Sequence, residues 1–229
     1  ASLTRLNGAT INFRGDAFGG AAGGGSIGDT GANDPLFLLS SGPFTTDATG
    51  LFAPWATVGN SDFATVNTNT GSIAQMTSTH PSRSFDLDTS TPANNWLNVA
   101  TGNANLTLGN VSVNSVAYAG TGGPITSDLG GFNLNIVSGG VFASGSNPVV
   151  IQNGVITAGN TASASANELI IHHQNPGMTV SASIQDNGGG GATSLVKTGA
   201  AALTLTGTNT YTGDTYINGG TINVDDLSR

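Results

Sequence analysis

Apolar and polar residues alternate in short runs along much of this chain. Three of the clearest runs, at residues 106–108, 134–136 and 203–205, place an apolar residue on each side of a polar one. Successive side chains of an extended strand point to opposite faces, so this spacing predicts strands with one buried side and one solvent-facing side.

Glycine and asparagine, which favour turns, separate these runs, and this pattern indicates many short strands. Residues 1–96 are less regular: a turn-then-strand pattern covers residues 6–13, and strands are predicted at Leu36–Leu39, Leu51–Val58 and Phe63–Val66. In residues 97–229 the predicted strands are Asn105–Leu108, Val111–Tyr118, Phe132–Val137, Val149–Ile156, Glu168–His172, Met178–Ile184, Ala202–Thr206 and Thr221–Val224.

The second part of the chain contains an irregular repeat. Each unit has two strands followed by a turn rich in Gly or Asn, such as residues 138–140 or 218–220. Strands that recur without intervening helices are typical of a β-solenoid, in which each strand stacks on its equivalent one coil away. A β-sandwich or jelly roll is the alternative. Comparable strands start at Leu106, Leu134, Leu169 and Leu203, at steps of 28, 35 and 34 residues.

No shift in composition marks a domain boundary, so we expect one continuous elongated domain over residues 1–229. Two segments are expected to be loops inserted into it: the glycine-rich residues 19–31, and residues 77–95, which are rich in Ser, Thr and Pro. Residues 97–229 are expected to form the regular coils.

Composition agrees with an all-β fold. Helix-forming charged residues are rare, since Glu168 is the only Glu and Lys197 the only Lys. Charged residues make up 8% of the chain, whereas about 25% is typical of soluble domains. The hydrophobic fraction is 37%, so the chain has material for a core and lacks the high charge of disordered segments.

Charge and cysteine content exclude several classes of function. Five Lys plus Arg and a net charge of −8 leave no basic stripe for nucleic acid. The chain has no Cys, which excludes disulfides and thiolate metal sites. No apolar stretch approaches the ~20 residues of a membrane-spanning helix. No signal peptide is recognised, and we expect a mature or trimmed piece of a longer protein.

Residues 195–224 carry the most specific pattern in the chain. A leucine is followed by Lys-x-Gly, then Leu-x-Leu-x-Gly-x-Asn-x-Tyr-x-Gly, then a strand that contains Gly-Thr-Ile. The segment resembles the autotransporter-associated β-strand repeat of bacterial surface proteins, with Ala201 where that repeat commonly has glycine. The matching residues are Lys197, Gly199, Leu203, Leu205, Gly207, Asn209, Tyr211, Gly213, Thr215, Gly220, Thr221 and Ile222.

The resemblance implies a right-handed parallel β-helix in an exported passenger domain at the bacterial cell surface. In that family the repeat is associated with passenger transport and folding. The two leucines of Leu-x-Leu are then expected inside the coil, and Gly207 and Gly213 at its corners. Asn209 is expected to bond its own turn, and Tyr211 to be a buried ring whose hydroxyl reaches a partner.

Parallel β-helices also carry the active sites of polysaccharide lyases and hydrolases, so an enzyme is an alternative. Such a site needs two or three converging carboxylates, or a calcium cluster beside an Arg or Lys. The nearest candidates are Arg83, Asp86 and Asp88, with His80 close by, because Asp86 and Asp88 share one face of an extended segment. Ordinary turn-forming aspartates in a solvated loop explain these residues better.

Other chemically interesting residues have structural explanations. The neighbours His172 and His173, and likewise Asp225 and Asp226, diverge on a strand, so neither pair is expected to form a joint site. Two glycine-rich segments, at residues 19–25 and 188–191, lack the Lys-Ser/Thr of a phosphate loop. Two tryptophans are expected to pack against the core rather than stack on sugars: Trp55 and Trp96.

We therefore expect a non-catalytic structural or adhesive segment outside the cell, with no cofactor and no metal ion. Its expected partners are surface glycans or other copies of itself. Self-assembly into a filament or surface layer is one alternative, because the ends of a solenoid are open sheet edges. A carbohydrate-active enzyme using Arg83, Asp86 and Asp88 is the other.

Overall fold

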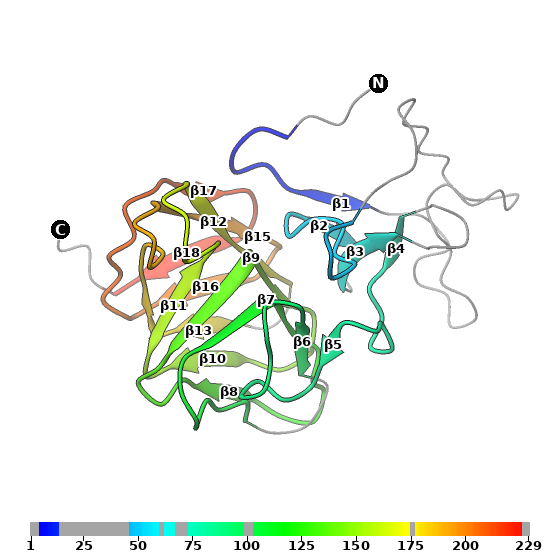
Figure 1. Ribbon diagram of the computed structural model, residues 1–229, viewed down its shortest axis with the longest axis horizontal. Coiled ribbons are helices and arrows are strands. Elements are labelled where there is room, and N and C mark those ends of the chain that lie inside the picture. The colour runs from blue at the N-terminus through cyan, green and yellow to red at the C-terminus, as the bar shows by residue number, and fades with distance from the viewer. Residues whose placement is uncertain are drawn as a thin grey trace, which may run out of the picture.

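The computed structural model describes residues 5–13, 46–59, 62–66, 73–98, 103–174 and 177–225. Every helix or strand among these residues is a β-strand (Figure 1). The first strands are β1 (Ile11–Phe13), β2 (Ala56–Val58), β3 (Asp62–Val66), β4 (Ile73–Gln75), β5 (Arg83–Ser84) and β6 (Asn95–Asn98). They are followed by β7 (Val111–Tyr118), β8 (Ile125–Asp128), β9 (Asn133–Ala143), β10 (Val149–Gln152), β11 (Val155–Ala158) and β12 (Asn167–His173). The last are β13 (Met178–Val180), β14 (Ser183–Ile184), β15 (Thr193–Thr198), β16 (Ala202–Leu205), β17 (Thr215–Ile217) and β18 (Thr221–Val224).

Parallel pairing between sequence-distant strands builds the second part of the chain into stacked coils. One wall of the stack is a five-stranded sheet in the order β18-β16-β13-β10-β8. The other two walls share β9, which bends at Gly139 (φ 79°); its first part pairs with β11 and its second part with β12. Each coil therefore follows three walls in turn, as expected for a β-solenoid.

The register of the five-stranded wall gives the coil length. Ile125, Val149, Met178, Leu203 and Ile222 occupy equivalent places, so successive coils take 24, 29, 25 and 19 residues. The coils are thus shorter and less even than the predicted steps.

The predicted equivalence of the four leucines is wrong. Leu134 lies on the first part of β9, Leu169 on β12 and Leu203 on β16, which belong to three different walls. Alternation specifies which side of a strand is buried, but the same alternation occurs on every wall, so it does not specify the wall.

The coil interior is filled by alternate residues from each wall. One row consists of Trp96, Val116, Val141, Ile171 and Lys197, each in register with the next. All five side chains are buried. Burying one large apolar side chain contributes roughly 1.5–3 kcal/mol, so such rows are the main source of cohesion between coils.

Residues 77–95, expected to be an inserted loop, consist mostly of turns but also take part in the coil stack. This segment contains β5, which pairs in parallel with β6, and it places Leu87 in the coil core. Parallel stacking therefore begins before residue 97. The other expected loop, at residues 19–31, lies outside the described residues, as do the glycines at 19–25 and the strand predicted at Leu36–Leu39.

Residues 105–108 do not form the predicted strand. The N–H groups of Ala104 and Leu106 do bond to the neighbouring strand β8, at the carbonyls of Thr126 and Asp128. Leu108, by contrast, is 76% exposed, because the chain turns there toward the side chain of Asp88.

Two predicted strands are each divided in two. Val149–Ile156 forms β10 and β11, separated by Asn153 at φ 55°, a left-handed conformation that Asn tolerates better than most residues. Met178–Ile184 forms β13 and β14, separated by Ser181 and Ala182. Both breaks are corners between walls.

A second, smaller sheet lies against the outside of the coils (Figure 1). Its order is β1-β2-β3-β4, with β1 and β2 parallel and the other two pairs antiparallel. Phe63 of this sheet lies 5.5 Å from Phe142, ring centroid to ring centroid. It packs on Gly140, where a Cβ atom would come within 2.9 Å of the ring. The apolar cluster that joins sheet and coils is Leu51, Phe63, Met76, Leu97, Ala117 and Phe142.

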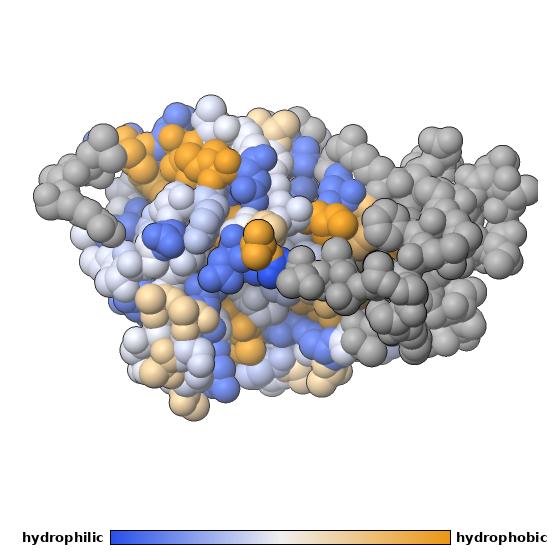
Figure 2. Space-filling model, turned by 90° about the horizontal axis from the view of Figure 1, so that it is seen from above, coloured by the Kyte–Doolittle hydropathy of each residue, from blue (hydrophilic) through white to orange (hydrophobic). Residues whose placement is uncertain are grey.

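The visible surface is mostly polar or neutral, with apolar residues in small separate groups (Figure 2). The described part of the chain has no helix long and apolar enough to cross a bilayer.

Candidate functional site

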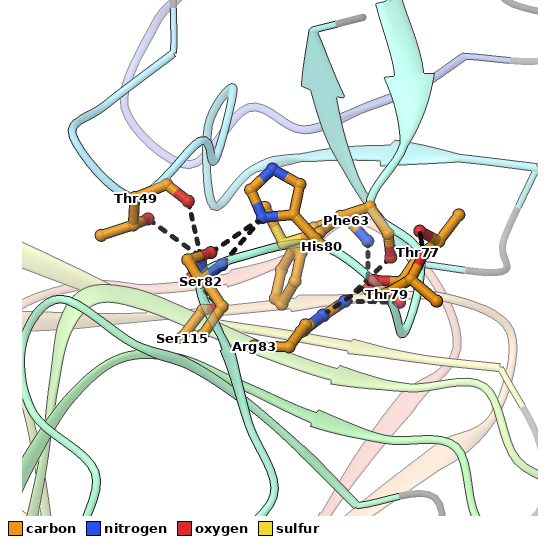
Figure 3. Close-up of polar contacts among 11 residues, drawn as sticks. Thr49, Phe63, Thr77, Thr79, His80, Ser82, Arg83 and Ser115 are labelled. Carbon is orange, nitrogen blue, oxygen red and sulfur yellow. Dashed lines mark hydrogen bonds and ion pairs between the residues drawn. The ribbon is translucent and has the colours of Figure 1, made fainter.

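Arg83 is buried where the first coil meets the small sheet (Figure 3). Its Nη2 lies 2.6 Å from Asp62 Oδ2, and the two side chains are 1% and 8% exposed. The same nitrogen donates to the Met76 carbonyl at 3.0 Å. Burial raises the pKa of Asp62, although the charge of Arg83 acts to lower it. Arg83 therefore serves to join β5 to the small sheet.

Asp86 and Asp88 do not contact Arg83 through any of their described hydrogen bonds, and each accepts bonds from other groups. Asp86 accepts bonds from the Asp88 N–H and the Thr89 hydroxyl, which closes a local turn. Asp88 reaches the next coil, where it accepts bonds from the Thr107 hydroxyl and from the Thr107 and Leu108 N–H groups. These bonds lower the pKa of Asp88. The structure therefore gives Arg83, Asp86 and Asp88 three separate sets of partners.

His80 belongs to a polar network on the same outer wall (Figure 3). Its Nδ1 lies 2.9 Å from Ser82 Oγ, and burial lowers its pKa. Asn95 donates to both Ser82 and Thr49. The Ser115 hydroxyl donates to Asn95 Oδ1 at 2.6 Å.

Sequence reasoning did not find this network, because Thr49 lies 46 residues from Asn95. The available signal was an Asn that begins a strand containing Trp and Leu. Within the described ranges, no group of three or more His, Asp or Glu side chains is placed to hold a metal ion.

His172 and His173 lie on opposite faces of β12, as predicted. His172 stacks on Phe142 with the rings 4.9 Å apart and nearly parallel. Burial and the nearby positive charge of Lys197 lower the pKa of His172 to about 4, so the ring is neutral at pH 7. His173 has no exposed surface.

The remaining candidates are placed as follows. Trp96 is buried in the coil core, and Trp55 packs beside Phe52 with Arg5 above its ring. Residues 188–191 form a turn held by Asn187, whose side-chain oxygen accepts two backbone N–H groups. Asp225 is exposed, and Asp226 lies outside the described residues.

Residues 195–224 run from β15 to β18 and extend over the last two coils, because β17 stacks on β15 and β18 on β16. Lys197 points into the coil and has no exposed surface. Its Nζ donates to the carbonyls of Thr198, Gly199 and Gly219, at 2.8, 2.8 and 3.2 Å. Burial lowers the pKa of Lys197 to about 8. The lysine of the motif thus ties one corner of its own coil to the equivalent corner of the next coil.

The glycines of the motif lie where one coil closely approaches the preceding one. A Cβ atom would lie 2.1 Å from the His173 carbonyl at Gly199, 2.4 Å from that of Ala182 at Gly207 and 2.5 Å from that of Thr193 at Gly213. Gly220, at φ 68°, is equally close to Ala201. Real Cβ atoms do not approach this closely, so a larger residue would push the coils apart.

Asn209 bonds the preceding coil instead of its own turn, which corrects the expectation. Its Oδ1 accepts the N–H of Ile184 at 2.9 Å. Among the described residues β14 is the last strand of its wall, and the side chain of Asn209 bonds the backbone of β14 where the next coil would otherwise add a strand.

Leu203 and Leu205 are buried, and Ile222 pairs with Leu203 and packs on the core. Thr221 pairs with Ala202. The half-buried Tyr211 packs on the core, and its hydroxyl lies 2.9 Å from that of Thr215. The conspicuous residues of the motif thus form the contacts that hold the last coil on the stack.

Comparison with known families gives one match. Residues 195–224 match the model of the passenger-associated-transport-repeat, which confirms the resemblance drawn from the same residues. Comparisons with curated proteins and with solved structures give no match.

Proposed function

We propose that this chain is a structural, non-catalytic segment of an exported bacterial surface protein of the autotransporter type. The observation that carries the proposal is the passenger-associated-transport-repeat at residues 195–224, which runs from β15 to β18 across the last two coils. A stack of coils held by nearest-neighbour contacts makes a stiff rod, which is suited to presenting contacts away from a cell. Adhesion to surface glycans is the role we assign to it.

The side chains of the enzyme alternative support a structural role instead. Arg83 is paired with Asp62, Asp86 closes a turn and Asp88 bonds the next coil. We also propose that the coils are right-handed, because connections between parallel strands of one sheet have this hand in nearly all proteins.

Surface labelling tests the location. Antibodies raised against the purified protein should label intact cells of the bacterium that produces it, and protease added to intact cells should remove the label. Labelling that requires permeabilised cells would contradict export.

Incubation with cell-surface polysaccharides tests the role. We expect the protein to be retained on immobilised glycans without releasing reducing ends. The control is the double variant Asp86→Ala, Asp88→Ala. Turnover that this variant abolishes, at an unchanged melting temperature, would replace our proposal with a carbohydrate-active enzyme.

Self-assembly is a second candidate, favoured by one observation at the end of the last coil. Ile217 and Val224 are 55% and 41% exposed, whereas their partners one coil earlier, Lys197 and Leu205, are 0% and 4% exposed. The end of the core is therefore open among the described residues, and a second copy is able to cover it.

A further inference from the structure

The beginning of the described chain lies across the outside of its last coils. In Figure 1 the blue segment that precedes β1 lies beside β17. Asn218, which follows β17, donates to the Gly8 carbonyl at 2.5 Å, across 210 positions of sequence. We call residues 5–10 the N-terminal strap.

Gly8 makes three contacts with the last coils, through its N–H, its carbonyl and its Cα. Its N–H donates to Glu168 Oε1 at 2.6 Å and its carbonyl accepts from Asn218. The ring of Tyr216 packs where a side chain would be: a Cβ atom on Gly8 would lie 2.5 Å from Tyr216 Cγ. Gly8 also has φ 77°, a conformation that favours glycine. A residue other than glycine therefore does not fit this place.

Arg5 provides the second point of attachment. Its Nη2 forms an ion pair with Glu168 Oε2 at 2.5 Å, so the only Glu in the chain contacts the strap through one hydrogen bond and one ion pair. Arg5 Nε donates to the Ala9 carbonyl at 2.7 Å, and the Ala9 N–H bonds back to the Leu6 carbonyl. The strap is thus a compact turn that is held by hydrogen bonds within itself as well as by the coils.

The receiving residues come from successive coils. Glu168 lies on β12, Thr198 on β15 and Tyr216 on β17; Thr198 lies 3.4 Å from the Thr10 hydroxyl, oxygen to oxygen. Among the described residues β17 pairs only with β15, through three residues. The strap therefore adds side-chain and backbone contacts to β17, a strand that is paired on one edge only among the described residues.

We propose that Glu168, Tyr216 and Asn218 form a recognition site for a short peptide turn of the form Arg-x-x-Gly. In this protein its occupant is the N-terminal strap, and occupancy clamps the last coil, which contains β17 and β18, onto the stack. The order of the last coil thereby depends on the presence of the start of the chain.

Hydrogen exchange of the full chain tests the clamp. Gly8→Ala should accelerate exchange at residues 215–217 by at least about tenfold through local opening, with β9 to β11 unchanged. Glu168→Gln, which removes the charge but keeps an acceptor, should give a smaller change at the same residues. The matched control is Gly131→Ala, since Gly131 has φ 86° and nothing within 4 Å of its would-be Cβ. Unchanged exchange in Gly8→Ala, or equal acceleration in every coil, would overturn the clamp.

Peptides added in trans test recognition. A capped peptide of residues 5–13, at millimolar concentration, should restore slow exchange at residues 215–217 of the Gly8→Ala variant. The same peptide carrying Gly8→Ala should not. Failure of the first peptide, or equal rescue by both, would overturn the recognition site.

Discussion

At the residue scale, the polar groups that drew attention in the sequence are used to join parts of the structure. Lys197 ties equivalent corners of the last two coils, and Arg83 ties the first coil to the small sheet. Neither side chain is 10% exposed. A buried charge is costly unless it is paired or fully hydrogen-bonded, so the partners of these two residues explain their burial.

Arg83→Met should strongly destabilise the protein. The substitution leaves the Asp62 carboxylate buried without its partner, and breaking such a pair costs roughly 3–5 kcal/mol. Urea unfolding measures the loss. The double variant Asp62→Asn, Arg83→Met should recover part of it, because no buried charge remains. A single variant as stable as the parent protein would disprove the structural role of Arg83.

At the element scale, two aspartates near coil corners, Asp186 and Asp128, accept several hydrogen bonds that connect neighbouring segments. Asp186, which follows β14, accepts the N–H groups of Thr193 and Thr212 at 2.8 and 2.9 Å and the Thr212 hydroxyl at 2.7 Å. Burial acts to raise the pKa of Asp186, but these bonds outweigh it and the pKa is lowered. Asp128 bonds Gly130 N–H, Gln152 and Asn153, and its pKa is lowered as well.

Stability should therefore fall in acid. A carboxyl group with a lowered folded pKa stabilises the protein above its unfolded pKa of about 4, and this contribution is lost as the pH falls through the folded pKa. Asp186→Asn should lower the free energy of unfolding at pH 7 by about 1 kcal/mol and flatten its decline below pH 4. The control is Asp225→Asn, at an exposed carboxylate. An acid decline as steep in Asp186→Asn as in the parent would contradict the assignment.

At the scale of the whole molecule, the two ends of the coil stack differ. In the first two coils, Leu87, Trp96 and Leu106 are 3%, 1% and 2% exposed, so the core is closed at that end. At the last coil Ile217 and Val224 remain exposed. If two molecules associate through their open ends alone, assembly stops at the dimer. In that dimer both open ends are covered, and only the two closed ends remain exposed.

Light scattering after size-exclusion chromatography should show that the protein forms dimers in a concentration-dependent way and does not form long filaments. Ile217→Lys with Val224→Lys should abolish it, because two charges would be buried in the contact. Leu108→Lys, an equally apolar exposed position near the first coil, should have no effect. A monomer at every concentration, or loss of pairing in the Leu108→Lys variant, would count against self-assembly through the last coil.

The sequence by itself determined the strand class, the turns and the repeat. Alternation and composition are local properties, and a coil made of short strands has local rules for which side is buried and where glycine is needed. The pattern at residues 195–224 was specific enough to identify the repeat that this segment contains. Neighbouring histidines at 172 and 173 could be assigned to opposite faces for the same reason.

Only the tertiary structure decided how these parts meet. The wall on which Leu134 or Leu169 lies depends on corners that differ from coil to coil. The partners of Arg83, Asn209 and Glu168 lie 21, 25 and 160 positions away. No short-range sequence pattern encodes such separations. They are set by the length of each coil and by the small sheet and the strap, which pack on the outside of the coils. The strap on Glu168 and the network around Asn95 are therefore properties of the folded molecule.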